Sequence, residues 1–188
     1  MKVPDATQDD LIEDLSEGKV WDSLSGADPV STEILDSGET LETYADGSAV
    51  ITGIEVPSES SREAGAVARA SNPVTGCVSR PNDSAGYLVR TGCTVRKSYA
   101  VHGMKFVGDY KVKSGSPGRI TDVRHGEVWS YISTYDIISG PSITKSSGYG
   151  SSPATARFSV KFTAASGYPT VHGWVQMNVA TSAWVTWG

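Results

Sequence analysis

Residues 156–164 alternate strictly between apolar and polar side chains. The apolar set is Ala156, Phe158, Val160, Phe162 and Ala164, and the polar set is Arg157, Ser159, Lys161 and Thr163. A period of two places the two sets on opposite faces of a β-strand, whereas a helix would group its apolar residues at every third or fourth position. The segment therefore predicts a strand with one face in a core and one toward solvent.

The same kind of short, strand-like segment fills the rest of residues 77–188. The other predicted strands are 86–90, 93–101, 104–113, 120–123, 127–138, 171–179 and 184–187. Turn-forming clusters of Gly, Pro and Ser separate several of them, as at residues 114–118 and 140–141. Many short strands without helical periodicity predict an all-β fold, an antiparallel β-sandwich (Ig-like or related), with an antiparallel barrel as the alternative.

The N-terminal part has local signals of its own. Residues 5–17 have the acidic start and apolar stripe of a short helix. Residues 40–44 and 49–56 are strand-like, and Asp46-Gly47 between them is a strong hairpin signal because both residue types tolerate positive φ. We expect the strand at 49–54 to add an edge strand to the downstream domain or to another molecule.

Charge divides the chain. Residues 1–63 hold 16 acidic and 3 basic side chains, a net of −13, and residues 64–188 hold 5 acidic and 13 basic, a net of +8. One interpretation is an acidic, partly disordered leader before a mildly basic domain. The other is a pro-segment or lid that masks a basic surface. The basic residues are scattered and match no nucleic-acid-binding pattern, so we expect no nucleic-acid partner.

These features predict three parts, namely an acidic leader with a short helix and hairpin (1–56), a linker (57–76) and a β-sandwich domain (77–188). The linker is small, polar and broken by prolines. Arg62 and Arg69 make it a plausible site of proteolytic cleavage. No apolar run reaches the roughly 20 residues of a transmembrane helix, and the chain begins without an apolar signal segment.

The two cysteines, Cys77 and Cys93, are expected to form a disulfide. Two cysteines in a β-domain rich in Gly, Ser and Thr fit an exported protein, and such a loop would stabilise the fold by about 3 kcal/mol. Their spacing is not that of a metal or redox motif. The sequence thus predicts an extracellular location.

Motifs for catalysis or cofactor binding are absent from the sequence, so no catalytic residue, metal ligand or cofactor is predicted. His102, His125 and His172 each precede a glycine and are interpreted as turn residues or exposed strand-end residues. An extracellular hydrolase that uses one of these histidines is left as an alternative.

Large aromatic residues are the candidates for a ligand or partner surface, since exposed aromatic side chains mark such surfaces. Trp129, Tyr131 and Tyr135 are expected to share one face of a strand, and three more tryptophans crowd the C-terminal segment. The candidate set is Trp129, Tyr131, Tyr135, Trp174, Trp184 and Trp187. The alternative is that these side chains only fill the core.

Four motifs carry a family resemblance, namely residues 41–48 (LETYADGS), Gly76-Cys77, Gly92-Cys93 and residues 106–110 (FVGDY). Over residues 40–135 the chain resembles a group of small exported proteins of high-GC Gram-positive bacteria, which have an acidic leader and a Cys-paired, β-rich C-terminal domain. The resemblance implies export and an all-β domain. It transfers no catalytic residue.

Together these observations predict a secreted, non-enzymatic binding module or a subunit of an extracellular assembly, with a protein or a cell-surface glycan as its partner. The first alternative is a secreted antibacterial or membrane-active toxin that is activated by removal of the acidic leader. The second is the histidine-dependent hydrolase. The oligomeric state is not predicted.

Overall fold

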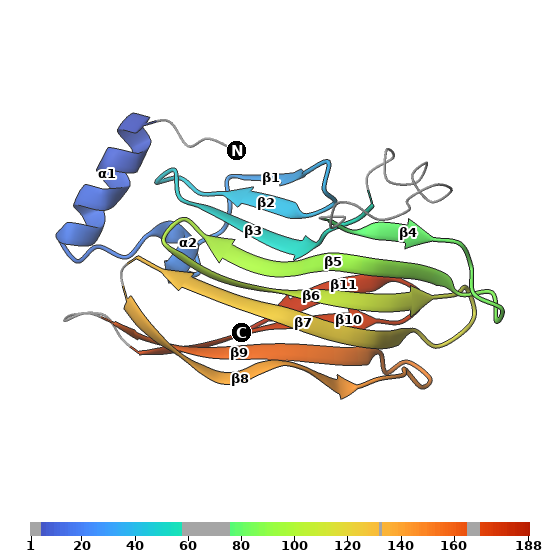
Figure 1. Cartoon of the computed structure of the whole chain (residues 1–188). Helices are drawn as coiled ribbons and strands as arrows, with labels where there is room; N and C mark the ends of the chain where they lie inside the picture. Colours follow the sequence, from blue (N-terminus) through green and yellow to red (C-terminus); the bar gives the residue numbers. More distant parts are fainter. Residues whose placement is uncertain (1–4, 58–75, 132, 165–169) are drawn as a thin grey trace, which may run out of the picture.

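The computed structural model describes residues 5–57, 76–131, 133–164 and 170–188. They form two antiparallel β-sheets that pack against each other (Figure 1), so the predicted all-β, sandwich-like fold is confirmed. The elements are α1 (Asp5–Ser16), α2 (Asp22–Ser25), β1 (Ser31–Ile34), β2 (Thr40–Thr43), β3 (Ala49–Ile54), β4 (Val78–Arg80), β5 (Leu88–Tyr99), β6 (His102–Val112), β7 (Arg119–Ser130), β8 (Ser133–Lys145), β9 (Ala154–Ala164), β10 (Val171–Val179) and β11 (Ala183–Trp187).

The seven-stranded sheet has the order β1-β2-β3-β5-β6-β7, and β4 pairs with β5 beside β3. The four-stranded sheet has the order β11-β10-β9-β8. Strand β11 is thus an edge strand, and it lies across β3 and β5 of the other sheet. This crossing places the C-terminal segment against residues from the beginning of the chain.

The core lies between the sheets and is built from alternate residues of each strand. Phe158 and Val160 of β9 and Met177 of β10 face Phe106 of β6, and all four side chains are fully buried. The predicted inward face of residues 156–162 is confirmed, while the side chain of Ala164 lies outside the described residues. Period-two alternation is therefore what positions the core.

The acidic leader contributes strands to the larger sheet. β2 and β3 form the predicted hairpin at Asp46-Gly47, and β3 pairs with β5 on its other side. The expected addition of this strand to the domain is confirmed, although β3 is an interior strand rather than an edge. Glu39 of the leader is almost fully buried and forms an ion pair with Arg96 of β5.

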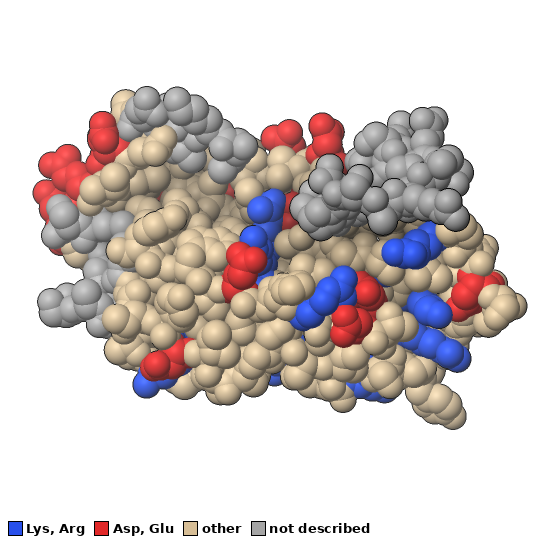
Figure 2. Space-filling view, viewed as in Figure 1, with Lys and Arg blue, Asp and Glu red and all other residues tan. Residues whose placement is uncertain are grey.

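Helix α1 confirms the helix predicted at residues 5–17 and packs through a small apolar cluster of its own. Leu11, Trp21 and Val101 are buried together, and Trp21 Nε1 donates a hydrogen bond of 2.9 Å to the carbonyl oxygen of Leu11. Acidic side chains gather over this helix, at the left of Figure 2, whereas basic and acidic side chains are interleaved over β5–β7. Apolar contact thus contributes to docking the helix.

Most of the predicted linker, with Arg62 and Arg69, lies outside the described residues. The three-part division of the chain and the removal of the leader therefore stay predictions. Neither described helix has the length and apolar character that a bilayer-spanning helix needs.

Three predicted chain breaks were wrong because the strands pass through them as irregularities. The break predicted at residues 140–141 lies inside β8, whose register with β9 shifts between Ser139 and Ser142. Most residues of the predicted strands 86–90 and 93–101 lie in the single strand β5 (Leu88–Tyr99), whose register with β6 shifts between Arg90 and Cys93. Gly92 sits in this shift with φ 72°, a left-handed conformation that glycine adopts without strain. Residues 120–130 are likewise continuous in β7, where His125 has φ 53°.

The prediction of one continuous strand over residues 127–138 was also wrong. β7 ends at Ser130, and β8 begins at Ser133 in the other sheet. The Ser130 and Ser133 hydroxyls lie 2.7 Å apart and join the two strand ends. A chain that changes sheets at this point cannot present Trp129 and Tyr135 on one strand face.

Candidate functional site

Strand β11 brings two tryptophans to an open edge of the sandwich. Its pairing with β10 places Trp187 beside Val175 on the core-facing side and Trp184 beside Asn178 on the opposite side. Because β11 is an edge strand, both indoles stay accessible, with 41% of Trp184 and 43% of Trp187 exposed. An edge strand that carries exposed indoles is typical of a contact surface.

A cavity of about 310 Å³, here called the β11 cleft, opens between β11 and the hairpin of β2 and β3. Its walls carry Thr40, Glu42 and Thr52 on the hairpin side and Trp184, Val185 and Trp187 on the β11 side. The hydroxyl of Thr52 is buried without a hydrogen-bond partner among the described residues. The cleft thus has tryptophans and oxygen-bearing side chains in one lining.

A second, smaller cavity of about 120 Å³ lies on the other side of Trp187 and is here called the Lys97 pocket. It is lined mainly by apolar and aromatic side chains, together with Lys97, His102 and His172. Trp187 lines both cavities. Trp187 therefore belongs both to a cleft that carries Glu42 and to a pocket that carries Lys97.

Lys97 occupies a core-facing position of β5, in the same alternation as Cys93 and Val95. Its Nζ lies 5.0 Å from the ring centroid of Tyr99 and 4.6 Å from that of Trp187. Burial lowers the pKa of Lys97 from 10.5 to about 8, and the charge of Glu42 opposes part of this shift. Lys97 is thus a poorly solvated cation held between two aromatic faces.

The neighbouring titratable groups are held uncharged by burial. The His102 ring lies 4.6 Å from that of Tyr99 and 4.9 Å from that of Phe162. Burial, with a contribution from the charge of Lys97, lowers the pKa of His102 to about 4. Burial also raises the pKa of Tyr99 to about 12, and Tyr44 and Glu42 add to the shift. At neutral pH Lys97 is therefore the charged group among these three.

The structure places the six aromatic candidates in five places. Trp184 and Trp187 line the β11 cleft, and Trp174 lines the Lys97 pocket, where Arg157 lies 4.2 Å from its ring centroid. Trp129 covers Gly103 on the neighbouring strand, where any Cβ would clash with the indole. The remaining two, Tyr131 and Tyr135, are exposed at the β7–β8 connection and on β8.

Sequence reasoning missed the polar partners of the tryptophans. Lys97 carried a usable signal, because it is a charged residue at an apolar position of an alternating strand. Glu42 and Thr52 carried none, since polar residues in a hairpin are ordinarily solvent-facing. Glu42 and Thr52 line a cleft only because β11 crosses over β3 and β5.

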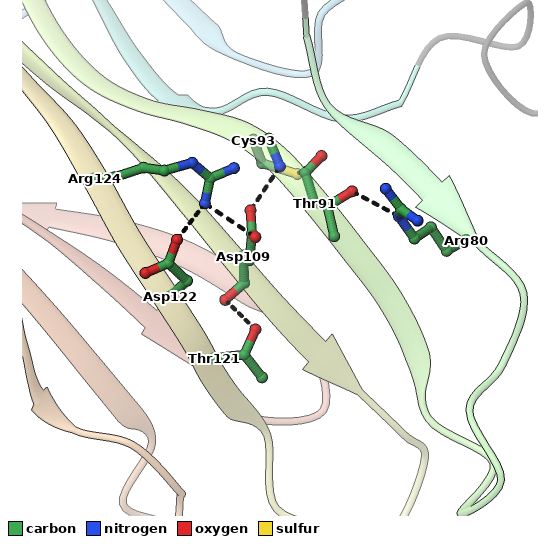
Figure 3. Close-up of polar contacts among 8 residues, drawn as sticks. Arg80, Thr91, Cys93, Asp109, Thr121, Asp122 and Arg124 are labelled. Atoms are coloured by element: carbon green, nitrogen blue, oxygen red, sulfur yellow. Dashed lines mark hydrogen bonds and ion pairs between the residues drawn. The ribbon is translucent and has the colours of Figure 1, made fainter. Parts of the chain in front are cut away.

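The predicted disulfide between Cys77 and Cys93 is present, and neither cysteine is free. It is anchored on its β5 side by the polar network of Figure 3. Asp109 accepts a hydrogen bond of 2.7 Å from the Gly92 N–H and forms an ion pair of 3.0 Å with Arg124. The hydrogen bond from Arg124 to Asp109 raises the pKa of Arg124. This network fixes the irregular turn of β5 beside the disulfide.

The histidines do not form a metal-binding cluster. His102 and His172 line the Lys97 pocket, whereas His125 is exposed in β7. Within the described ranges no group of three His, Cys, Asp or Glu side chains could hold a metal ion. His172 lies near the start of β10 and is exposed, as expected of a strand-end residue, and His102 begins β6 but is half-buried. His125 lies inside β7, so its interpretation as a turn or strand-end residue was wrong.

Neither a protein-family model nor a curated protein matches this chain. Among solved structures, the chain is similar to the crystal structure of the hypothetical protein lmo2686 from Listeria monocytogenes EGD-e. The two share 13% sequence identity with a TM-score of 0.38, and the match covers 80% of this chain and 92% of the other. A likeness at this level carries no argument about function.

Proposed function

We propose that this protein is a secreted, non-enzymatic module that binds a carbohydrate chain in the β11 cleft. The observation that carries the proposal is that two accessible tryptophans, Trp184 and Trp187, line the same cleft as Thr40 and Glu42. A sugar ring has an apolar C–H face that packs on an indole and hydroxyl groups around its rim that need hydrogen-bond partners. The cleft offers both kinds of contact.

The cleft is suited to binding more than to hydrolysis. Among the described residues of its lining, Glu42 is the single carboxylate, and its Oε2 accepts a hydrogen bond of 3.3 Å from the hydroxyl of Tyr44. Glycoside hydrolysis ordinarily needs two carboxyl groups on either side of the scissile bond. The polar atoms of the cleft are instead of the kind that orient a bound ligand.

Secretion is supported by the disulfide. Cys77 and Cys93 are paired, and disulfides persist mainly in oxidising compartments outside the cytosol. Mass spectrometry of the natural protein without reduction tests this part of the proposal. It should show a mass two hydrogens below that of the dithiol form, and it would also give the mature N-terminus. Two free thiols would contradict secretion.

Carbohydrate binding is tested with the full chain in pull-down assays on insoluble cell-wall polysaccharides and by tryptophan fluorescence with soluble oligosaccharides. Trp184→Ala and Trp187→Ala should each weaken binding about tenfold or more, since central aromatic contacts are worth 1–3 kcal/mol or more. The matched controls are Tyr131→Ala and Tyr149→Ala, at positions where 80% and 84% of the side chain is exposed. An equal loss of binding in the two control variants, or no loss of binding in the tryptophan variants, would contradict the proposal.

A further inference from the structure

The Lys97 pocket differs from the β11 cleft in charge, although the two cavities share Trp187. The described residues that line the pocket include one lysine and two histidines and no Asp or Glu side chain. The described lining of the cleft includes Glu42 and no lysine or arginine. A ligand that spans both cavities therefore meets a carboxylate on one side of the indole and an ammonium on the other.

The ammonium of Lys97 is in contact with no carboxylate among the described residues, and Glu42 acts on it only as a charge outside ion-pair distance. The contacts of the ammonium are the faces of Tyr99 and Trp187, and none of the ion pairs among the described residues includes it. An aromatic face stabilises a cation by roughly 0.5–2 kcal/mol but accepts no strong hydrogen bond, so the N–H donors of the ammonium remain available. A half-buried cation that touches no carboxylate is a costly arrangement, and a ligand that supplies an anion in contact would lower this cost.

We propose that the Lys97 pocket receives a carboxylate group, so that the glycan recognised by this protein contains acidic sugars. This inference rests on the proposed function of the β11 cleft. One sugar ring lies against Trp187 in the cleft, and the carboxylate of the same or the next residue reaches past the indole to Lys97. The ammonium then donates charge-assisted hydrogen bonds to the carboxylate oxygens.

The pocket limits what can enter. A volume of about 120 Å³ admits a small acidic substituent but not a second chain. Its apolar walls, Met104 and Phe162 among them, strengthen the attraction between the ammonium and an anion by excluding water. A neutral hydroxymethyl group would fit the same space without neutralising Lys97. The pocket therefore favours an acidic sugar over its neutral counterpart.

The test measures binding of the full chain to a panel of acidic glycans, each paired with its neutral form. Polygalacturonate is paired with its methyl ester, and hyaluronan, alginate and peptidoglycan fragments are paired with their carboxyl-reduced forms. Wild-type protein should bind the acidic member of at least one pair about tenfold more tightly, as one charge-assisted contact would give. Lys97→Met should abolish this preference while retaining binding to the neutral member.

The matched control is Lys145→Met on β8, at the opposite edge of the four-stranded sheet, where Lys145 donates a hydrogen bond to Ser152. This variant should keep the preference for the acidic member. If the wild type binds the neutral members at least as tightly as the acidic ones, and this binding depends on Trp187, the inference is overturned while the proposed function stands. If the wild type binds no member of the panel, both are overturned. Thermal melting of Lys97→Met verifies that the variant is folded.

Discussion

The ammonium of Lys97 lies 4.6 Å from the ring centroid of Trp187, so a cation from the inner face of one sheet is covered by an indole from the edge of the other. This contact links the two sheets between the β11 cleft and the Lys97 pocket. It also withdraws the lysine from water, which is the main reason that its pKa falls to about 8.

The lowered pKa of Lys97 predicts a pH-dependent stability. Below pH 8 the lysine is protonated in both states, and the folded protein bears the full cost of a poorly solvated cation. Between about pH 8 and pH 10.5 the folded state has lost this proton while the unfolded state retains it, so the free energy of unfolding rises with pH.

Urea unfolding of the wild type and of Lys97→Met at several pH values from 7 to 9.5 measures this effect. The stability advantage of the methionine variant over the wild type should shrink as the pH rises. The raised pKa of Tyr99, about 12, keeps its ionisation above this range. A difference between the two proteins that stays constant with pH would show that Lys97 titrates normally.

Loss of the Cys77–Cys93 disulfide should destabilise the fold by about 3 kcal/mol, because the bond closes a short loop in the unfolded chain. Urea unfolding with and without reductant measures the change in the free energy of unfolding. The double variant Cys77→Ser, Cys93→Ser is the control, and its unfolding should be the same in both conditions. Equal stability of the wild type with and without reductant would contradict the prediction.

Asp109 and Asp122 both contact Arg124, but only Asp109 also accepts the Gly92 N–H. Asp109→Ala should lower the free energy of unfolding by about 1.5–3 kcal/mol. The substitution removes the carboxylate that accepts the half-buried Gly92 N–H and that pairs with the Arg124 guanidinium. Asp122→Ala should change stability by less than about 0.5 kcal/mol, because that side chain is largely exposed. Chemical unfolding of the two variants compares these costs directly, and equal costs would mean that the Gly92 contact contributes little.

Leu11 and Ile12 are neighbours in α1, yet 3% of Leu11 and 62% of Ile12 are exposed. Leu11→Ala should weaken the docking of the helix by about 2–3 kcal/mol, whereas Ile12→Ala should have little effect. Limited proteolysis of the N-terminal segment measures docking independently of global unfolding. Faster cleavage in Leu11→Ala alone supports the prediction, and similar rates in both variants would indicate that α1 is not held by this cluster.

The sequence by itself determined the class of the fold and several of its local elements. Alternation over residues 156–162, the Asp46-Gly47 hairpin and the helix at residues 5–17 depend on neighbours only a few positions apart, so local patterns predict them. The cysteine pairing followed from there being only two cysteines. The bulges at Gly92 and His125 were read as breaks, because a shift of register inside a continuous strand has no distinct local signature.

Only the tertiary structure decided which of these surfaces meet. Trp184 and Trp187 line one cleft with Glu42 and Thr52 because β11 crosses the strands of the leader, and no property of either segment alone specifies that crossing. The same crossing places Trp187 over Lys97. From the sequence alone, Lys97 is only a charged residue at a strand position that should carry an apolar side chain. Contacts between sheets depend on the twist and alignment of whole layers, which are set by the packing of the complete core.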